Sequence, residues 1–217
     1  GSIYTFAGGK TYSVSETFII GQANGCAITT VKSNSPGTAA NFVSSATVTS
    51  TYLDMQDISF TGVGSTTFTA NNSINNPNNN GINFGNLSPR NMYWIGGTGD
   101  WSDGSKWSLS SGGPALGCPP SSADNIYFDQ NSFSAANQTF KIDIDNAACK
   151  NITWAGVTNN PTFNYNSKEL KVYKSYELDP NMSVTGNGTT NFAGTSTSTL
   201  DTKGNSLYSV NINGASV

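Results

Sequence analysis

The chain has 217 residues and a formal net charge of −3, with 11% charged residues and no histidine. Its basic residues are scattered and include one arginine, which excludes the basic patch of a nucleic-acid-binding protein, and no apolar run approaches the roughly 20 residues of a membrane-spanning helix. Without histidine, serine triads, cysteine–histidine pairs and histidine-bearing metal sites are excluded.

Short strands separated by turns are predicted along the whole chain. Asn, Thr, Ser and Gly are abundant, and Asn and Gly tolerate positive φ while Thr suits a pleated sheet. No window of about eleven residues carries the apolar spacing of a helix. The protein is therefore predicted to be all-β. In chain order, the clearest strand-like units are 17–20, 28–31, 46–48, 66–69, 141–145, 168–173 and 209–213.

The spacing of these units predicts a solenoid. From Cys149 onward, apolar strand units recur about every ten to twenty residues, which fits a right-handed parallel β-helix whose coils stack on one another. The same rhythm also fits antiparallel β-sandwich modules. Asn-rich turns favour the solenoid, because stacked asparagines form hydrogen-bonded ladders. We predict solenoid-like repeat segments joined by a Trp/Gly-rich linking segment, with the sandwich as the alternative.

The chain also resembles itself at two related offsets. Residues 57–63 match 151–157, an offset of 94, and residues 6–11 match 192–197, an offset of 186, about twice the first. Internal periodicity of this kind is typical of solenoids and arrays. The self-match supports a repeat architecture.

Three of the four tryptophans, Trp94, Trp101 and Trp107, lie within 93–108 among several glycines. In a structural interpretation the aromatic side chains close one end of a solenoid or seal a junction, and the glycines let the backbone pass close to the rings. In a functional interpretation the three indoles and Tyr93 form a platform on which sugar rings stack. Asp100, Asp103 and Asn91 would then bind sugar hydroxyls.

The run YWIGGTGDWSDGSKWSLSSGG at 93–113, followed by CPP and DNIYFDQNSF, resembles the repeat unit of giant surface adhesins exported by the type IX secretion system of gliding Bacteroidetes. The segments YTFAGGKTYSV at 4–14 and TTFTANNSINNPNNNGINF at 66–84 are similar to the end of a preceding repeat. NITWAGV at 151–157 is similar to the opening of the next. Lys106 stands where the family usually has an aromatic residue or histidine before the third tryptophan.

The resemblance implies an extracellular protein anchored at the cell surface. It implies that 1–90 is the C-terminal part of one adhesin repeat, 91–117 a Trp/Gly-rich junction and 118–217 the N-terminal part of the next. The implied partners are neighbouring repeats of the same chain and a surface polysaccharide or substratum, contacted during adhesion or gliding. A segment that recurs in every repeat is more suited to scaffold than to a receptor site, which favours the structural interpretation of the tryptophans. We expect a stalk segment, with a carbohydrate-binding module using Trp94, Trp101 and Trp107 as the alternative.

The cysteines also suggest an extracellular location. Cys118 and Cys149 flank a segment of about thirty residues, and a bridge there would restrict the unfolded chain by roughly 3–4 kcal/mol through loop-closure entropy. Low charge and turn-rich strands already suggest secretion, where disulfides persist. We predict a Cys118–Cys149 disulfide, with buried thiols as the alternative. Cys26 has no obvious partner.

Four aspartates are candidate calcium ligands, in the pairs Asp100–Asp103 and Asp124–Asp129. Calcium takes about six to eight oxygen ligands, and neither pair follows the spacing of an EF-hand or a calcium-binding β-roll. Turn capping and solvated faces explain these residues as well, so no cofactor is expected. A glycosidase or lyase using paired carboxylates would rely on Asp124 and Asp129, with Arg90 to hold an anionic sugar. We predict that the chain is not an enzyme.

Overall fold

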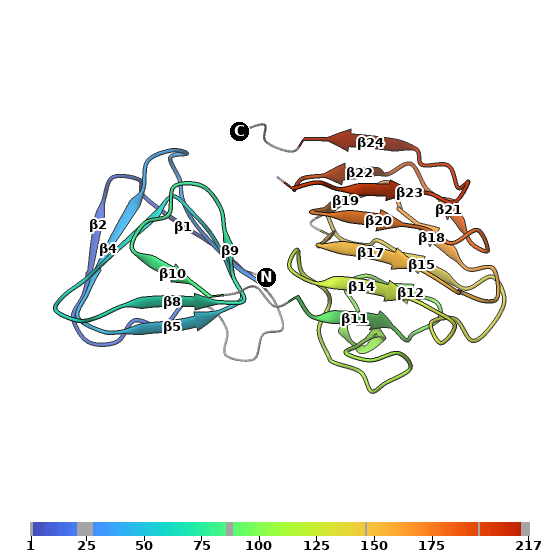
Figure 1. The fold of residues 1–217 in the computed structure, drawn as a ribbon, viewed down its shortest axis with the longest axis horizontal. Coiled ribbons are helices and arrows are strands. Elements are labelled where there is room, and N and C mark those ends of the chain that lie inside the picture. The colour runs from blue at the N-terminus through green and yellow to red at the C-terminus, as the bar shows by residue number, and fades with distance from the viewer. Residues whose placement is uncertain (1, 21–27, 86–88, 146, 195, 214–217) are drawn as a thin grey trace. The chain divides into compact units, whose positions relative to one another are not determined.

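The computed structural model describes residues 2–20, 28–85, 89–145, 147–194 and 196–213. The chain divides into two compact units, Gly1–Ser88 and Pro89–Val217. Each unit is a β-solenoid, in which the chain winds around three sides and adds parallel strands to them coil by coil (Figure 1). No α-helix occurs in the described ranges. The predicted all-β solenoid fold is confirmed.

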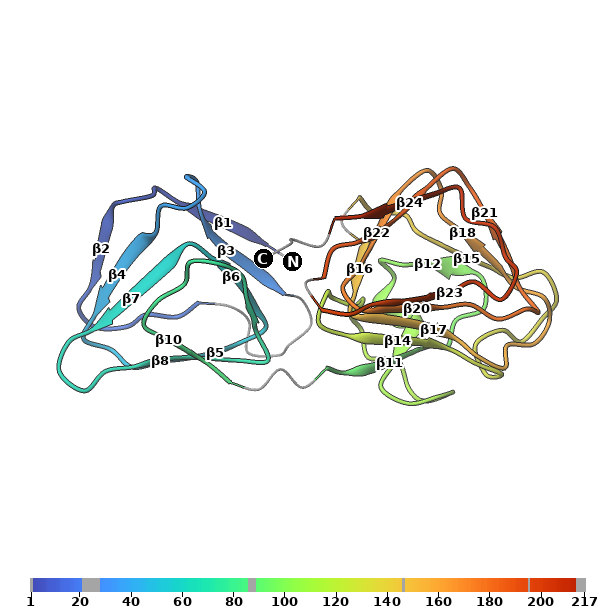
Figure 2. The ribbon, with the colours of Figure 1, turned by 45° about the horizontal axis from the view of Figure 1, so that its top comes forward.

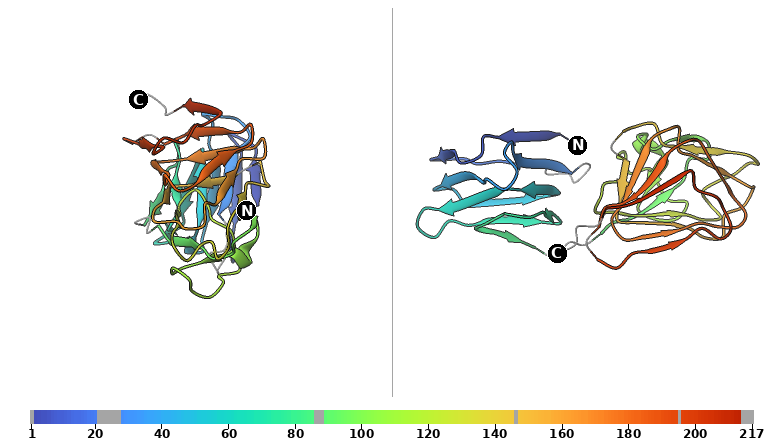
Figure 3. Two further views of the ribbon diagram at one scale, coloured as in Figure 1. Left: turned by 90° about the vertical axis from the view of Figure 1, so that its right-hand side faces the viewer. Right: turned by 90° about the horizontal axis from the view of Figure 1, so that it is seen from above.

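Three parallel sheets form the sides of the first unit, and Figure 3 shows its coils stacked one on another. The first sheet has the order β1-β3-β6-β9, the second β2-β4-β7 and the third β10-β8-β5, because the chain returns to each side once per coil. The strands are β1 (Ile3–Phe6), β2 (Thr11–Val14), β3 (Thr29–Ser33), β4 (Ala40–Ser44), β5 (Val48–Thr51), β6 (Leu53–Gln56), β7 (Ile58–Gly62), β8 (Phe68–Asn71), β9 (Ile74–Asn75) and β10 (Ile82–Phe84).

The second unit also has three sides, which Figure 2 shows around a common interior. Its sheets have the orders β13-β11-β14-β17-β20-β23, β12-β15-β18-β21 and β16-β19-β22-β24. The elements are β11 (Asn91–Trp94), β12 (Gly99–Asp100), the 3₁₀-helix η1 (Gly104–Lys106), β13 (Trp107–Ser108), β14 (Asn125–Phe128), β15 (Thr139–Lys141), β16 (Ala147–Cys149), β17 (Asn151–Trp154), β18 (Thr162–Asn164), β19 (Glu169–Val172), β20 (Ser175–Glu177), β21 (Ser183–Thr185), β22 (Thr189–Phe192), β23 (Thr199–Asp201) and β24 (Ser209–Ile212).

The strand pairing rules out the antiparallel sandwich. Every strand pair in the described residues is parallel except β11 with β13. The register places like residues above one another, as in Ile126↔Ile152 between β14 and β17 and Phe140↔Phe163 between β15 and β18. Adjacent coils therefore present the same faces inward and outward.

Alternation along the strands builds a separate core in each unit. Val31 and Met55 are paired inward-facing residues of the first unit, and both are fully buried. In the second unit Ile126, Ile152 and Tyr176 form one such column at 0% exposure. Each coil is thin, so most of its apolar surface is buried against the coils above and below it.

An asparagine ladder, expected at the turns, instead runs through the first residues of three strands on the outer face of the second unit. The Asn125 Nδ2 donates to Asn91 Oδ1 at 2.9 Å, and the Asn151 Nδ2 donates to Asn125 Oδ1 at 2.6 Å. The Asn151 Oδ1 in turn accepts from the Ser175 backbone N–H at 3.0 Å. The ladder links four successive coils because the parallel register stacks equivalent positions.

Three predicted strands differ from the structure. Residues 17–20 form no strand, and of 46–48 only Val48 lies in a strand, as the first residue of β5. The strand predicted at 141–145 ends at Lys141, because the chain turns a corner there. Its two carboxylates serve that corner: Asp143 accepts from the Ser102 backbone N–H at 3.0 Å, and Asp145 accepts from Lys168 Nζ at 2.6 Å.

Candidate functional site: the tryptophan cap

The tryptophan-rich segment begins the second unit and closes the first coil. After β11 the chain passes β12 and η1 and returns as β13, which pairs antiparallel with β11 in the register Trp94↔Trp107. A parallel solenoid adds its next strand one coil further along, whereas this reversal lays β13 on the outer edge of β11. We call residues 91–118 the tryptophan cap. They lie inside the second unit, while their assignment as a junction between repeats stays a prediction.

The indoles of the cap fill the interior. Trp94, Trp101 and Trp107 each have 0% exposure. The Trp94 and Trp107 ring centroids lie 5.1 Å apart at 76°, and those of Trp101 and Trp107 lie 5.7 Å apart at 66°. Phe140 of the next coil contacts Trp94 at 4.8 Å. Aromatic pairs of this kind contribute about 0.5–1.5 kcal/mol beyond their area burial, so the cap is held by a connected group of rings.

Two of the three indole N–H groups are satisfied within the cap. The Trp94 Nε1 donates to Gly97 O at 2.9 Å, and the Trp107 Nε1 donates to Trp101 O at 3.0 Å. The Trp101 Nε1 is buried and has no hydrogen-bond acceptor. The rings are thus positioned by backbone carbonyls at two points and by packing alone at the third.

Glycine at two positions lets the backbone approach the packed side chains. A Cβ on Gly99 would lie 3.1 Å from the Trp94 ring, and one on Gly96 would lie 2.0 Å from the Lys106 side chain. Lys106 lies across Gly96 and donates from Nζ to Gly96 O at 3.0 Å. Lys106, which stands where the resembling family usually has an aromatic residue or histidine, therefore places a long side chain over Gly96.

The glycan-stacking prediction is wrong for Trp94, Trp101 and Trp107. A sugar ring stacks on an exposed indole face, and these indoles have no exposed surface. Tyr93 alone among the four predicted residues is partly exposed. Its ring stacks on Tyr127 of the next coil at 5.1 Å and 21°, so the two rings cover one another's faces. Burial, and secondarily the Tyr93 ring, raises the pKa of Tyr127.

Each candidate calcium ligand has a different local partner. Asp100 pairs with Lys141 at 3.0 Å. Asp103 caps η1 and accepts from the Ser105 backbone N–H at 3.0 Å and from its hydroxyl at 2.6 Å, and these hydrogen bonds lower the pKa of the Asp103 carboxyl. Asp129 accepts from the Asn131 backbone N–H at 2.9 Å. Among the described residues no three acidic, cysteine or histidine side chains gather into a metal-binding group.

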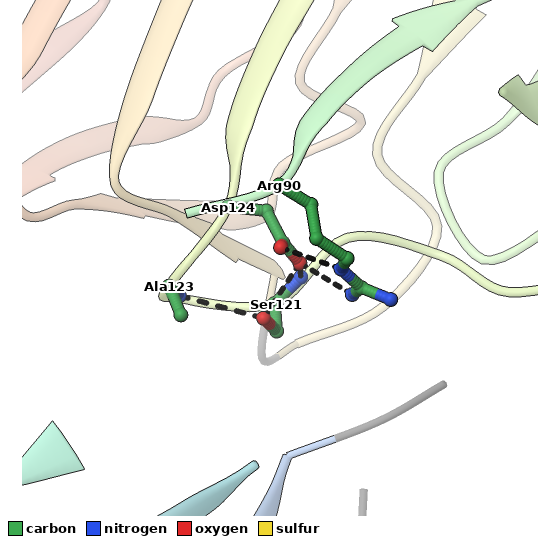
Figure 4. Close-up of polar contacts among 4 residues, drawn as sticks. All are labelled: Arg90, Ser121, Ala123 and Asp124. Carbon is green, nitrogen blue, oxygen red and sulfur yellow. Dashed lines mark hydrogen bonds and ion pairs between the residues drawn. The ribbon is translucent and has the colours of Figure 1, made fainter. Parts of the chain in front are cut away.

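Asp124 forms a buried ion pair that the sequence did not indicate (Figure 4). The Arg90 Nε donates to Asp124 Oδ1 at 2.8 Å and a terminal nitrogen, Nη2, donates to Oδ2 at 2.7 Å. Ser121 donates to Oδ2 from its backbone N–H at 2.8 Å and from its hydroxyl at 2.7 Å. Through Arg90 and Ser121, the Asp124 carboxylate ties the residue before β11 to the loop before β14. Its side chain is 1% exposed, so the carboxylate is closed to a substrate.

The predicted Cys118–Cys149 disulfide is not formed. Cys149 faces inward from β16 and belongs to the core of the second unit, whereas Cys118 is buried outside that core, in the loop beside Gly104. Burial, and secondarily the charge of Asp124, raises the pKa of the Cys149 thiol, which keeps it protonated. Cys26 lies outside the described residues.

Comparison with protein-family models, curated proteins and solved structures found no match. A search of the described residues for a helix long and apolar enough to cross a membrane also found none. Function is therefore argued from the two solenoids and the tryptophan cap.

Proposed function

We propose that this chain is a structural stalk segment of an extracellular surface adhesin, which spaces a binding region from the cell. The observation that carries the proposal is the complete burial of the tryptophan cap. The segment with the strongest resemblance to adhesin repeats supplies interior side chains to a solenoid. That placement suits a scaffold element that recurs along a filament.

The solenoid supplies the mechanical properties that a stalk needs. Successive coils are joined by parallel backbone ladders on three sides and by inward columns such as Ile126, Ile152 and Tyr176. The strand separation of about 4.8 Å sets the rise of each coil along the axis. Each unit therefore behaves as a short stiff rod, because bending it would open ladder hydrogen bonds on one side.

A surface-display experiment tests this proposal. One, two and three copies of the chain are placed between a membrane anchor and an epitope tag, and the height of the tag and the adhesion of the cells are measured. We expect the tag to move outward with each copy while adhesion to polysaccharide-coated surfaces stays at the level of the anchor alone. Glycan-specific adhesion that is lost in Tyr93→Ala or Tyr127→Ala would instead identify a binding module.

A further inference from the structure

Two tyrosines are stacked on the outer face of the second unit. Tyr93 of β11 and Tyr127 of β14 lie in register on neighbouring parallel strands, and their ring centroids are 5.1 Å apart at an interplanar angle of 21°. Both side chains point outward, because the residues on either side of each tyrosine in its strand are buried. Neither ring belongs to the core of the unit.

Each of the two rings has the other as its aromatic partner. Among the described residues, no third ring packs against either of them. The next position of the same outward column is Thr153, and Ser108 of β13 lies on the other side of Tyr93. A reactive species formed on one phenol therefore has a single aromatic partner on this face of the solenoid.

The backbone ladder keeps the two phenols together. Strands β11 and β14 pair over three consecutive positions, and the Asn125 Nδ2 donates to Asn91 Oδ1 at 2.9 Å on the same face, two residues away from the rings. Neighbouring strands lie about 4.8 Å apart. Two groups held in this way react as if each were present at very high concentration, because folding has already removed the entropy of bringing them together.

A second pair of tyrosines shows why exposure matters. The hydroxyls of Tyr165 and Tyr176 lie 3.0 Å apart, but these residues are only 2% and 0% exposed. Tyr93 and Tyr127 are both partly exposed, so a dissolved oxidant reaches the outer pair and not the inner one. The three indoles of the tryptophan cap have no exposed surface and are closed to the oxidant as well.

We propose that Tyr93 and Tyr127 are an oxidative cross-linking site, at which a peroxidase and hydrogen peroxide join two successive coils through a dityrosine bond. Each phenol gives up one electron and one proton, and hydrogen peroxide takes up the two electrons and two protons to become two molecules of water. The two phenoxyl radicals form a carbon–carbon bond between the ring positions next to their oxygens. The hydrogen on each bonded carbon then moves through water to the oxygen, which restores both phenols. The chain loses two hydrogen atoms in total.

The bond fastens the coil that contains the tryptophan cap. It joins β11 to β14 and so closes the chain between them into a covalent loop. A covalent link across a long loop restricts the unfolded chain, as a disulfide does. The cross-linked second unit should therefore unfold at a higher urea concentration than the unmodified one. The inference does not rest on the proposed stalk function.

Mass spectrometry of the oxidised chain tests the inference. The 217-residue chain is treated at low concentration with a haem peroxidase and hydrogen peroxide, and the monomer is isolated to remove links between molecules. Trypsin then leaves Tyr93 as the single tyrosine of peptide 91–106 and Tyr127 as the single tyrosine of peptide 107–141. We expect these two peptides to be joined and two hydrogen atoms lighter than their sum, and the monomer to show dityrosine fluorescence.

Conservative variants separate the cross-link from the fold. Tyr93→Phe and Tyr127→Phe keep the stacked rings and each remove one phenol, so neither variant should give the joined peptides or the higher unfolding midpoint after oxidation. Tyr208→Phe is the matched control at a tyrosine that is 69% exposed, and its monomer should cross-link as the wild type does. Circular dichroism spectra before oxidation establish that each variant is folded.

Three results would overturn the proposal. The first is a wild-type monomer that loses no hydrogen atoms under conditions that cross-link free tyrosine. The second is a joined pair of peptides 91–106 and 107–141 that persists in Tyr127→Phe. The third is a monomer whose main cross-link joins Tyr165 to Tyr176, since exposure would then not select the site.

Discussion

Asn76 and Asn79 hold one corner of the last coil of the first unit with amide hydrogen bonds, whereas Trp101 and Trp107 cover the first coil of the second unit with packed rings. The amides satisfy backbone groups of the coil beneath them and bury little apolar surface. The indoles exclude water from a wide aromatic core. One outermost coil is therefore held by satisfying polar backbone groups and the other by covering an apolar interior, and these interactions differ in energy and in sensitivity to substitution.

The largest expected effect comes from removing a ring of the tryptophan cap. Trp107→Ala should lower the unfolding free energy of the second unit by about 3–5 kcal/mol, because it leaves a cavity among Trp94, Trp101 and Phe140. All four tryptophans lie in the second unit, so indole fluorescence during urea unfolding reports that unit. A loss below about 1 kcal/mol would show that the cap is dispensable.

Breaking the buried ion pair should have a similar or slightly smaller effect. Breaking a buried pair costs about 3–5 kcal/mol when the remaining charge has no other partner. In Arg90→Met the Asp124 carboxylate keeps its two hydrogen bonds from Ser121, so the loss should lie at the lower end of that range. The double variant Arg90→Met/Asp124→Leu should recover part of the loss. The same fluorescence measurement checks both variants. A double variant no more stable than Arg90→Met would show that the loss comes from side-chain packing instead.

Removing the Asn79 amide should give an intermediate effect confined to the first unit. Asn79→Ala removes the acceptor of the Ile58 N–H and the donor to Met55 O, which predicts a loss of about 1–3 kcal/mol. Far-ultraviolet circular dichroism follows the unfolding of both units. The unfolding transition of the first unit should shift, while the fluorescence transition, which reports the second unit, stays in place. Asn78→Ala is the matched control in the same turn, although its positive φ of 70° adds a small backbone cost.

Comparing two conservative substitutions sharpens the account of the tryptophan cap. Trp101→Phe removes an N–H that has no acceptor, whereas Trp107→Phe leaves the Trp101 carbonyl without its donor. Both lose similar ring area, so the difference between their unfolding free energies should be about 1 kcal/mol, with Trp107→Phe the less stable. Equal losses would mean that ring packing alone sets the strength of the cap.

The smallest expected effect is a pH dependence of the first unit. Burial raises the pKa of Asp54 above its usual 3.8, partly offset by the Asn76 hydrogen bond and the charge of Lys32. The folded state therefore binds a proton more readily than the unfolded chain, and its stability falls as pH rises from near 3.8 through the folded pKa. Asp54→Asn should remove this slope in unfolding midpoints measured across that range. A slope that persists would assign the titration to another group.

Local features of the fold were predictable from the sequence, and features that join distant residues were not. Alternating polar and apolar residues located β19 and β24. The abundance of asparagine suggested hydrogen-bonded ladders at turns, but the ladder through Asn91, Asn125 and Asn151 runs along strands. Alternation recurs in successive coils, so sequence spacing alone carries it. The end-closing interpretation of the tryptophans also agrees with their burial.

The incorrect predictions concern pairs whose geometry depends on the winding of the chain. Arg90 and Asp124 are brought together by a full coil, and no spacing rule for metal or catalytic sites describes that separation. Cys118 and Cys149 follow a familiar disulfide spacing, yet the coil places them in different surroundings. Whether the indoles are exposed could not be predicted from composition, because a sugar-stacking surface and a buried solenoid end use the same residue types.

The parallel register has a consequence for how such a protein diversifies. The corner between β14 and β15 spans 129–138, while the equivalent corner of the next coil, between β17 and β18, spans 155–161. Both coils nevertheless keep Phe140 and Phe163 in register. The longer corner therefore adds residues without displacing a strand, and it places Phe133 in the core against Phe128 and Trp154. The entropic penalty grows slowly with loop length. New surface segments can accumulate at the corners while the interior columns stay unchanged.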